Sequence, residues 1–415
     1  MRRTEHRIVI LGAGLTGAGT ALSLANRGIP VTLIDQDETP LNRASLRNEG
    51  KIHLGFIYAK DPTLATARLQ LDGALKFRAL LKCWIGARAD ALRRSTSFLY
   101  LVARDSLLTP DELHDHYDRV EVSYQESLRA DPAVDYLGER PERLFERCSM
   151  AALAGVFDTK RFSAAYRTVE RAIDPHELAR ALRRAISDSP NVIFLPHHKV
   201  LHIGRANDGL QIEGTSPAGP WHMRTEQVVN ALWDQRIAFD RMIGMDRPDG
   251  WVHRLKYRVI ARLPDKLHGA PSVTMALGPY GDVVVRPNGT AYLSWYPLCL
   301  RGWTHDLRPS AAWDAPCRGQ VEEAQSRSLA REILDAIDVW YPGIGASQPI
   351  VVDAGAIVAY GTTDVGDSSS ALHDRTQIGV TSAGSYHSVD PGKLTTAPLF
   401  AQEAADRVYA YAAQR

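Results

Sequence analysis

The sequence predicts a mixed α/β fold with two domains, one built on a parallel sheet and one on an antiparallel sheet. Residues 7–35 read as strand, glycine-rich turn, helix and strand, and residues 378–412 repeat a strand, a glycine-containing loop and a helix. Between them, residues 250–305 alternate between apolar and polar side chains, as half-buried antiparallel strands do. The length of 415 residues allows two or three domains at roughly 150 residues each.

The first stretch, RIVILGAGLTGAGTALSLANRGIPVTLID, is typical of a Rossmann-like dinucleotide site. In its turn, Gly12 permits a tight exit from the strand, Gly14 lets the backbone approach a pyrophosphate, and Gly17 lets the following helix pack on the sheet. The N–H groups and dipole at the start of that helix attract phosphates. A second strand ends at Asp35, where a carboxylate would accept hydrogen bonds from a ribose diol. This pattern assigns to the cofactor Gly12, Gly14, Leu15, Thr16, Gly17 and Asp35.

Two alternatives remain open for this stretch. Residues 8–25 carry no charge and follow arginines, which also suits a signal peptide or a membrane span. Glycines interrupt the run and an acid closes it, so we favour the nucleotide site. The second alternative is an adenine nucleotide in place of a dinucleotide.

The composition is that of a globular protein, with 45% hydrophobic and 23% charged residues. A formal net charge of +1 lacks the basic surface that tracks nucleic acid phosphates. The 4 cysteines are far apart and form no C-x-x-C pair, which indicates a reducing cytoplasm and no structural metal. We therefore expect a cytoplasmic protein with a small-molecule substrate and without a nucleic-acid partner or an integral membrane segment.

Residues 44–68 form a polar, glycine-marked stretch that is too irregular for one helix or strand. The part NEGKIHLG, with Tyr58 beyond it, resembles the loop that passes the flavin in the D-amino acid oxidase superfamily. It is most similar to the loop of L-2-hydroxyglutarate and glycerol-3-phosphate dehydrogenases. The resemblance implies FAD as cofactor and a contact of His53 with flavin or substrate, although a lone histidine is more often structural. The cofactor residues expected in this loop are Ser45, Asn48, Gly50, Lys51 and His53.

The next segment predicts two helices with a strand between them. A long helical pattern covers residues 61–94, and we interpret its basic face as solvated rather than membrane-bound. Residues 98–102 read as a strand, and an N-terminal capping pattern opens a helix over residues 109–128. His114 and His116 in that helix point to different faces and cannot easily share a metal.

Residues 155–231 are expected to return to the cofactor domain. A capped helix begins at Asp174 and leads to four short strands, the last at residues 227–231. This order resembles the second block of the superfamily, whose last strand ends in V-V-N-A-x-G-x-W. Here residues 228–233 read VVNALW, without the glycine, so the resemblance is weaker at this point. The cofactor residues expected in this block are Val200, Asn230 and Ala231.

Residues 250–305 predict the antiparallel sheet, with Asn288-Gly289 as a hairpin turn. Alternation puts Tyr292, Ser294 and Tyr296 on one face. In the superfamily such a sheet roofs the substrate cavity, so this face either lines that cavity or meets solvent. An amphipathic helix is expected over residues 320–340.

The stretch IGVTSAGSYHSVDPGKLTT at residues 378–396 leads into a helix over about residues 397–412. It matches neither a P-loop nor the G-x-S-x-G of a hydrolase. It resembles the closing motif of the same superfamily, in which the loop and the helix N-terminus, capped here by Thr395 and Thr396, face the flavin pyrimidine edge. The resemblance places Lys393 near the flavin. The cofactor residues expected here are Gly384, Gly392, Lys393, Leu394 and Thr395.

The whole chain is thus identified as a member of the D-amino acid oxidase superfamily, with His53, Tyr386, His387 and Lys393 as candidate catalytic residues. We expect a discontinuous, Rossmann-like FAD domain of the glutathione-reductase type and an inserted α+β substrate domain. The FAD domain is predicted at residues 1–80, 150–240 and 350–415, and the substrate domain at residues 81–149 and 241–349.

The reaction that the resemblance implies is hydride transfer to flavin from a C–H bond next to an amine or hydroxyl. Residues 355–360 lack the arginine that many amino acid oxidases carry there, which argues against a simple amino acid carboxylate clamp. A pyridine-nucleotide dehydrogenase, a flavin-dependent RNA-modifying enzyme and a flavin-binding protein without turnover are the alternatives.

Overall fold

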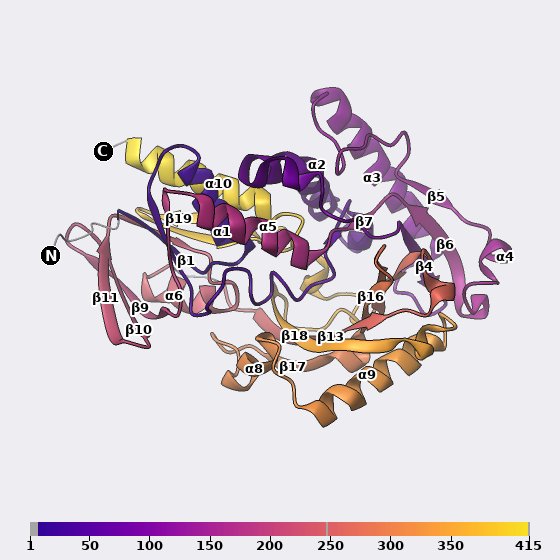
Figure 1. Cartoon of the computed structure of the whole chain (residues 1–415). Coiled ribbons are helices and arrows are strands. Elements are labelled where there is room, and N and C mark those ends of the chain that lie inside the picture. Colours follow the sequence, from indigo (N-terminus) through magenta and orange to yellow (C-terminus); the bar gives the residue numbers. More distant parts are fainter. Residues whose placement is uncertain (1–6, 246–247, 414–415) are drawn as a thin grey trace.

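The computed structural model describes residues 7–245 and 248–413, and within them the predicted α/β class is confirmed. Two large sheets lie next to each other (Figure 1). Helices α1 (Leu15–Ala25), α5 (Pro175–Asp188) and α10 (Ala397–Ala413) cover the first sheet, and α9 (Glu323–Asp338) packs on the second. In this described part of the chain, no helix has both the length and the apolar character needed to cross a membrane.

The first sheet is mostly parallel, as the glycine-rich stretch predicts. In order across the sheet its strands are β19 (Gly379–Ala383), β20 (Tyr386–Asp390), β12 (Gln227–Asn230), β1 (Ile8–Leu11), β2 (Val31–Ile34) and β8 (Val192–Leu195). Among the described strands of this first sheet, only β19 and β20 pair in antiparallel fashion. All four residues of β1 are buried, since both neighbouring strands and the covering helices exclude water from it.

The second sheet is mainly antiparallel and contains the predicted hairpin at Gly289, whose φ is +74°. In order its strands are β17 (Leu300–Thr304), β13 (Trp251–Arg262), β16 (Thr290–Trp295), β15 (Gly281–Val285), β14 (Ser272–Ala276), β4 (Phe98–Ala103), β6 (Phe162–Thr168) and β5 (Phe145–Arg147), and β18 (Gln348–Tyr360) also pairs with β13. Smaller sheets are formed by β3 (Lys51–Ile52) with β7 (Arg171–Ala172), and by β9 (Lys199–Ala206), β10 (Gly209–Ser216) and β11 (Gly219–Thr225).

Two strands lie on the other side of the boundaries expected from the sequence. β6 and β18 belong to the antiparallel sheet, although the sequence predicts residues 150–240 and 350–415 in the cofactor domain. Their partner strands, β4 and β13, are distant in sequence, so no local sequence pattern predicts these pairings. We therefore propose a substrate domain that includes both strands.

The remaining helices are α2 (Ala65–Ile85), α3 (Pro110–Ala130), α4 (Met150–Leu153), α6 (Arg236–Met242), α7 (Tyr296–Cys299) and α8 (Asp314–Cys317). α3 begins with the expected capping box, in which Thr109 Oγ1 accepts a hydrogen bond from the Glu112 N–H. The helix expected over residues 61–94 is shorter. It starts after Leu64 and stops at Gly86, whose φ of +60° ends the helical hydrogen bonding.

The stretch at residues 378–396 also differs from the expected loop. β19 and β20 form a hairpin that turns at Gly384, and a loop follows only from Pro391. The apolar and β-branched residues on either side of the glycine allow pairing, which the glycine pattern conceals.

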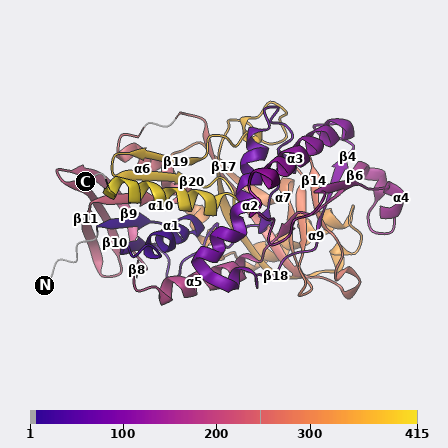
Figure 2. The same ribbon diagram turned by 90° about the horizontal axis from the view of Figure 1, so that it is seen from above.

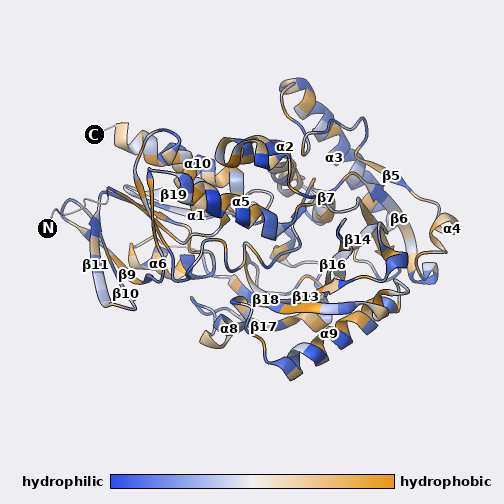
Figure 3. Ribbon diagram, viewed as in Figure 1, coloured by the Kyte–Doolittle hydropathy of each residue, from blue (hydrophilic) through white to orange (hydrophobic). Residues whose placement is uncertain are grey.

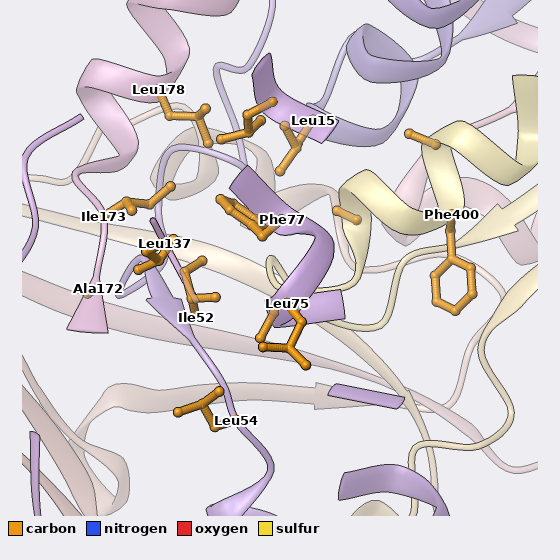
Figure 4. Close-up of a cluster of buried hydrophobic side chains, with 14 of the residues drawn as sticks. Leu15, Ile52, Leu54, Leu75, Phe77, Leu137, Ala172, Ile173, Leu178 and Phe400 are labelled. Carbon is orange, nitrogen blue, oxygen red and sulfur yellow. The ribbon is translucent and has the colours of Figure 1, made fainter. Parts of the chain in front are cut away.

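An apolar core connects the cofactor-side helices to the loop after β3. Figure 4 shows side chains of α1, α2, α5 and α10 in one cluster with Ile52 and Leu54. α2 lies in the middle of the molecule, between α1 and α10 on one side and α3 on the other (Figure 2). Hydrophobic strands fill the interior, and hydrophilic residues mark the outer faces of α5 and α9 (Figure 3). The core thus holds the first turn of α1 and the residue 51–54 loop in one rigid unit.

Candidate active site

A cavity of ≈ 760 Å³ is lined by residues from both large sheets. One end, which we call the nucleotide end, is lined by Gly12, Gly14, Leu15, Thr16, Asp35, Val200 and Ala231. The other end, which we call the charged end, is lined by Glu49, Lys51, His53, Tyr58, Arg254, Lys256, Tyr292, Tyr296, Arg375, Gly392, Lys393 and Leu394. Most of the residues singled out in the sequence therefore meet at one cavity.

The three glycines of the first turn have different roles. A Cβ on Gly17 would lie 1.9 Å from the Gly12 carbonyl oxygen, and one on Gly12 would lie 2.7 Å from the Ala231 oxygen. Both glycines are therefore required by the fold itself. A Cβ on Gly14 would meet a single atom among the described residues, Ser45 Oγ at 3.2 Å, so its glycine leaves space on the cavity side. Gly14 is the position at which the backbone is open to a ligand.

The N-terminus of α1 is arranged to attract an anion. Gly14 is its N-cap, and glycine has no side chain that could cap the helix. The Leu15 N–H donates to Ser45 Oγ at 2.8 Å, which ties the following loop to the helix start. The N–H groups and the positive dipole end of a helix N-terminus favour a phosphate at this place.

Asp35 lies at the end of β2, as expected, and its carboxylate is held by the backbone. It accepts hydrogen bonds from the Ala13 N–H at 2.6 Å and from the Asp37 N–H at 2.9 Å. Burial raises the pKa of this carboxyl group. A carboxylate has about four acceptor sites, so two can still serve a ribose.

Trp233 occupies the position at which the superfamily pattern has glycine. Its φ is +52°, a conformation that glycine adopts more easily than tryptophan. The indole Nε1 donates to the Ala356 oxygen at 2.8 Å, and the residue lines the cavity with Ala231 and Leu232. The backbone path of the pattern is thus kept without the glycine, and the tryptophan connects it to β18.

The loop after Ser45 is shaped by its own side chains. Asn48 Nδ2 donates to the carbonyl oxygens of Ala44 and Ser45, and its Oδ1 accepts from the Gly50 N–H at 2.8 Å. Gly50 has φ of +80°, and a Cβ there would lie 2.0 Å from the Ile173 oxygen. The direct role of Asn48 and Gly50 in the structure is to fix this loop beside the cavity.

Lys51 is fully buried in a polar network below the charged end. Its Nζ donates to Tyr100 Oη at 2.8 Å and to Thr274 Oγ1 at 2.6 Å, and lies 3.1 Å from Glu170 Oε2. The ammonium thus has an acidic and two hydroxyl partners in the protein. Lys51 therefore ties the cofactor-side loop to β4 and β14.

His53 lies in the charged end, 3.6 Å from the Oε1 of Glu49 through its Nε2. Neither ring nitrogen has a hydrogen-bond partner among the described residues, although both are buried. Burial lowers the pKa of His53, while Glu49 acts in the opposite direction. The main-chain N–H donates to Thr395 Oγ1 at 2.9 Å, so the C-terminal loop positions this histidine.

Lys393 and Leu394 line the charged end from the loop before α10. Burial lowers the pKa of Lys393 to about 8, and the negative charge of Glu49 opposes this shift. The expected capping by threonines is not what the structure has. Thr395 accepts from His53, and Thr396 Oγ1 donates to the Pro391 oxygen at 2.6 Å.

Tyr386 and His387 are on β20 in the first sheet and are not among the residues that line the cavity, contrary to the expectation. Tyr386 Oη donates to Asp240 Oδ1 at 2.9 Å. His387 Nδ1 is 2.8 Å from Ser382 Oγ, and burial lowers its pKa to about 4. Both side chains are occupied in packing the sheet edge against its neighbours.

Asn230 and Gly384 do not reach the cavity either, contrary to expectation. The Asn230 amide donates to Asp240 and to Tyr386 Oη, within a buried cluster that includes Arg236. Gly384 forms the turn of the β19–β20 hairpin with φ of +64°. The motif thus predicted the strand correctly but did not predict the direction in which each side chain points.

The cationic side chains that the second sheet contributes to the cavity were not predicted from the sequence. Arg254 and Lys256 lie on β13 and, with Arg258, occupy alternate positions on one face of a buried strand. That alternation of basic residues was the available signal. Arg375 has no hydrogen-bond acceptor for Nε within the described part of the chain, and burial lowers its pKa to about 10. Glu49 was the other omission.

Two tyrosines of the expected face line the cavity, Tyr292 on β16 and Tyr296 at the start of α7, whereas Ser294 is not among the lining residues. Tyr292 is buried and borders the charged end, and burial raises its pKa to about 12. Tyr296 Oη accepts from Arg254 at 3.0 Å and donates to Asp364 at 2.6 Å. Ser294 contacts the neighbouring strand at the Asp282 N–H, at 3.4 Å. In the residues that the structure describes, no group of three or more His, Cys, Asp or Glu side chains could hold a metal ion.

Residues 7–407 match the family model described as FAD dependent oxidoreductase. The aerobic glycerol-3-phosphate dehydrogenase of Staphylococcus epidermidis is 40% identical over 60 residues, 14% of this chain and 11% of that protein. The tRNA 5-methylaminomethyl-2-thiouridine biosynthesis bifunctional protein of Marinobacter nauticus is 44% identical over 67 residues, 16% of this chain and 11% of that protein. Both matches span only a small part of the relative.

Solved structures share the fold over almost the whole chain. Glycine oxidase from Geobacillus kaustophilus has a TM-score of 0.67 at 16% identity, covering 98% of this chain and 95% of that chain. L-alpha-glycerophosphate oxidase from Mycoplasma pneumoniae, solved with FAD bound, has a TM-score of 0.63 at 16% identity, covering 97% and 94%. L-proline dehydrogenase from P. horikoshii has a TM-score of 0.67 at 16% identity, covering 97% and 93%.

Proposed function

Because the chain belongs to the FAD dependent oxidoreductase family, we propose that it oxidises a C–H bond next to an amine or hydroxyl of a small anionic molecule. FAD is the cofactor of this family. The observation that carries the proposal is the charged end of the cavity, where the His53–Glu49 pair lies among four cationic side chains. These are Arg254, Lys256, Arg375 and Lys393.

The nucleotide end fits a dinucleotide. Gly14 leaves its cavity side open and, as the N-cap of α1, places no side chain over the helix N-terminus. Asp35 ends the neighbouring strand with acceptor sites to spare. We expect the pyrophosphate at the α1 N-terminus and a ribose at Asp35. The isoalloxazine would then lie toward His53 and Lys393.

FAD, when bound, supplies the ring that accepts the hydride. The chain itself supplies a base. Burial lowers the pKa of His53, so the imidazole is neutral near pH 7 and can take a proton from a substrate hydroxyl or ammonium. Among the described residues, neither ring nitrogen of His53 has a hydrogen-bond partner, so the imidazole can accept this proton. Glu49, at 3.6 Å from Nε2, would stabilise the imidazolium that forms.

The cationic side chains support an anionic substrate. Arg375 is buried and lacks an acceptor at Nε among the described residues, which is costly unless a ligand provides one. Arg254 is partly neutralised by Asp364, at 3.8 Å. Glycine, L-proline and L-alpha-glycerophosphate, which appear in the names of the similar structures, each join an anionic group to an amine or hydroxyl. The missing arginine at residues 355–360 is thus replaced by cations from β13 and from the loop after His373.

The test is anaerobic reduction of the bound flavin by a panel of amino acids, hydroxy acids and glycerol phosphates, each paired with a neutral ester or dephosphorylated analogue. We expect reduction by an anionic member and at least tenfold slower reduction by its neutral analogue, the worth of about one charged hydrogen bond. His53→Ala should slow that reduction by about two to four decades. Glu49→Gln should shift the acidic limb of the pH profile of flavin reduction to lower pH, because Glu49 raises the pKa of His53.

His114→Ala is the matched control, because the His114 side chain is 38% exposed and is not among the residues that line the cavity. Equal rates for the anionic substrate and its neutral analogue would contradict the substrate class. A His53→Ala variant as fast as the wild type would remove His53 as the base.

A further inference from the structure

The nucleotide end of the cavity is covered by a segment of the antiparallel-sheet side. Residues 308–314, which we call the strap, follow β17 and lead into α8. Strap residues line the cavity together with Asp35, Asp37 and Arg43. The wall of the cavity that includes Asp35 therefore also includes a segment that is distant from Asp35 in sequence.

One arginine joins the strap to the cofactor side. Arg43 Nε and Nη2 bind the two carboxylate oxygens of Asp37 at 2.8 and 2.9 Å. Its remaining Nη1 donates to Asp314 Oδ1 at 2.7 Å. The fork geometry of the guanidinium thus fixes Asp314 relative to the strand that carries Asp35.

Further contacts orient the strap at both of its ends. The Arg308 guanidinium lies 5.5 Å from the centre of the Phe239 ring, which lines the same end of the cavity. At the other end, Arg318 Nη2 lies 3.0 Å from Asp314 Oδ2. Asp314 is therefore shared between an arginine of each domain.

Among the described residues, Arg43 and Arg47 each make an ionic connection to the antiparallel-sheet side, and the one from Arg43 to the strap is the weaker. The other joins Arg47 and Arg258 to Asp353, and the side chains of all three are at most 5% exposed. The Asp314 side chain is 44% exposed. Separating a buried pair leaves uncompensated charge, whereas a half-exposed pair opens into water. The Arg43–Asp314 pair is therefore the easier of the two to separate.

We propose that the strap holds the adenosine half of FAD in the cavity and that the Arg43–Asp314 ion pair is the latch that limits FAD release. The proposal uses only the cofactor of the family and is independent of the substrate. It predicts that FAD leaves by opening of the strap rather than by separation of the whole interface, since the Asp353 connection stays closed.

The experiment measures FAD release from the holoenzyme after dilution, by the rise of free flavin fluorescence. Asp314→Asn should release FAD about two- to fivefold faster than the wild type, the range for an exposed ion pair. Glu332→Gln is the matched control, because it removes a pair with Arg301 whose side chains are 45% and 44% exposed, far from the cavity. The wild-type rate should rise with salt, and that of Asp314→Asn should not.

Hydrogen exchange of the same holoenzymes gives a second measurement. Amides of residues 308–313 should exchange faster in Asp314→Asn, while those of β1 stay unchanged. Wild-type release kinetics in Asp314→Asn, or a wild-type release rate that is independent of salt, would overturn the latch. Equal acceleration by Glu332→Gln would show general loosening of the domain and would overturn it as well.

Discussion

The two ends of the cavity are built from different parts of the polypeptide. The nucleotide end is formed mostly by the backbone. It consists of glycines without side chains, the N–H groups of a helix start, and a carboxylate held by main-chain donors. At the charged end, long side chains from β13, the residue 49–53 loop and the loops around Arg375 and Lys393 converge. The backbone path depends on the glycines at the first end, whereas it does not depend on the long side chains at the second.

The largest effect expected from this difference is at the backbone-built end. Gly14→Val should abolish FAD binding, while the apoprotein still folds, because a Cβ there meets only the movable Ser45 Oγ among the described residues. Gly17→Val should instead unfold the domain, since its Cβ would lie 1.9 Å from a carbonyl oxygen. Visible flavin absorption and thermal unfolding of both variants separate these outcomes.

Gly155→Val is the control for the glycine substitutions, because a Cβ there has no described atom within 4 Å outside its own neighbours. A Gly14→Val protein that retains a full complement of flavin would break the assignment of this turn to the pyrophosphate.

A smaller loss is expected for Asp35→Ala. Its carboxylate holds the turn through the Ala13 and Asp37 N–H groups and has acceptor sites left for a ribose. The loss of one or two charged hydrogen bonds, about 1.5–3 kcal/mol each, should weaken FAD binding at least tenfold. Titration of the apoprotein with FAD measures this. An unchanged affinity would locate the ribose contact elsewhere, with Asp37 the next candidate.

At the charged end, the effect should fall on the substrate and spare the cofactor. Arg375→Met should raise KM for the anionic substrate about ten- to hundredfold, the worth of one charged hydrogen bond, with FAD content unchanged. Steady-state kinetics and the flavin spectrum measure the two quantities. Arg331→Met, which removes an exposed ion pair with Asp335, is the control. Loss of FAD in Arg375→Met would show that the two ends are not independent.

The smallest effect concerns the redox potential. Lys393→Met should lower the flavin potential by on the order of 30 mV, the equivalent of about 1.4 kcal/mol for two electrons, because an ammonium favours the anionic reduced ring. The pKa of Lys393 is lowered from 10.5 to about 8, so its charge is present below pH 8 and is lost as the pH rises through 8. The difference between variant and wild type should therefore vanish above that pH.

Spectroelectrochemical titration at several pH values measures this difference. A difference that persists unchanged at pH values well above 8 would assign the effect to packing rather than to charge.

The nucleotide end and the charged end also differ in how much of each could be predicted from the sequence. The strand, turn and helix around Gly12 to Asp35 follow from a local pattern, and so do the hairpin at Gly289 and the cap at Thr109. Side-chain direction was the weak point. Tyr386 and His387 stand in a conspicuous motif, but successive side chains of a strand point to opposite faces of the sheet, and there Tyr386 contacts Asp240 while His387 contacts Ser382.

The charged end was less predictable, since it depends on contacts between residues distant in sequence. Arg254 and Lys256 reach the cavity only because β13 lies beside β18 and β16. Glu49 was overlooked although it stands four residues before His53, because an irregular loop gives no periodicity from which to infer that the two side chains meet.

The strand order of the first sheet also determines when the chain can fold. β1 lies between β2 and β12, and β12 in turn pairs with β20, so residues 8–11 need partners from residues 227–230 and 386–390. α10, the last helix, packs on α1, where Thr20 Oγ1 donates to the Ala401 oxygen at 3.2 Å. Such distant pairings close late and slowly. During synthesis on the ribosome, the nucleotide end of the cavity therefore cannot form before β20 and α10 are made, and a nascent chain interrupted before them would expose the apolar strands of an unfinished sheet.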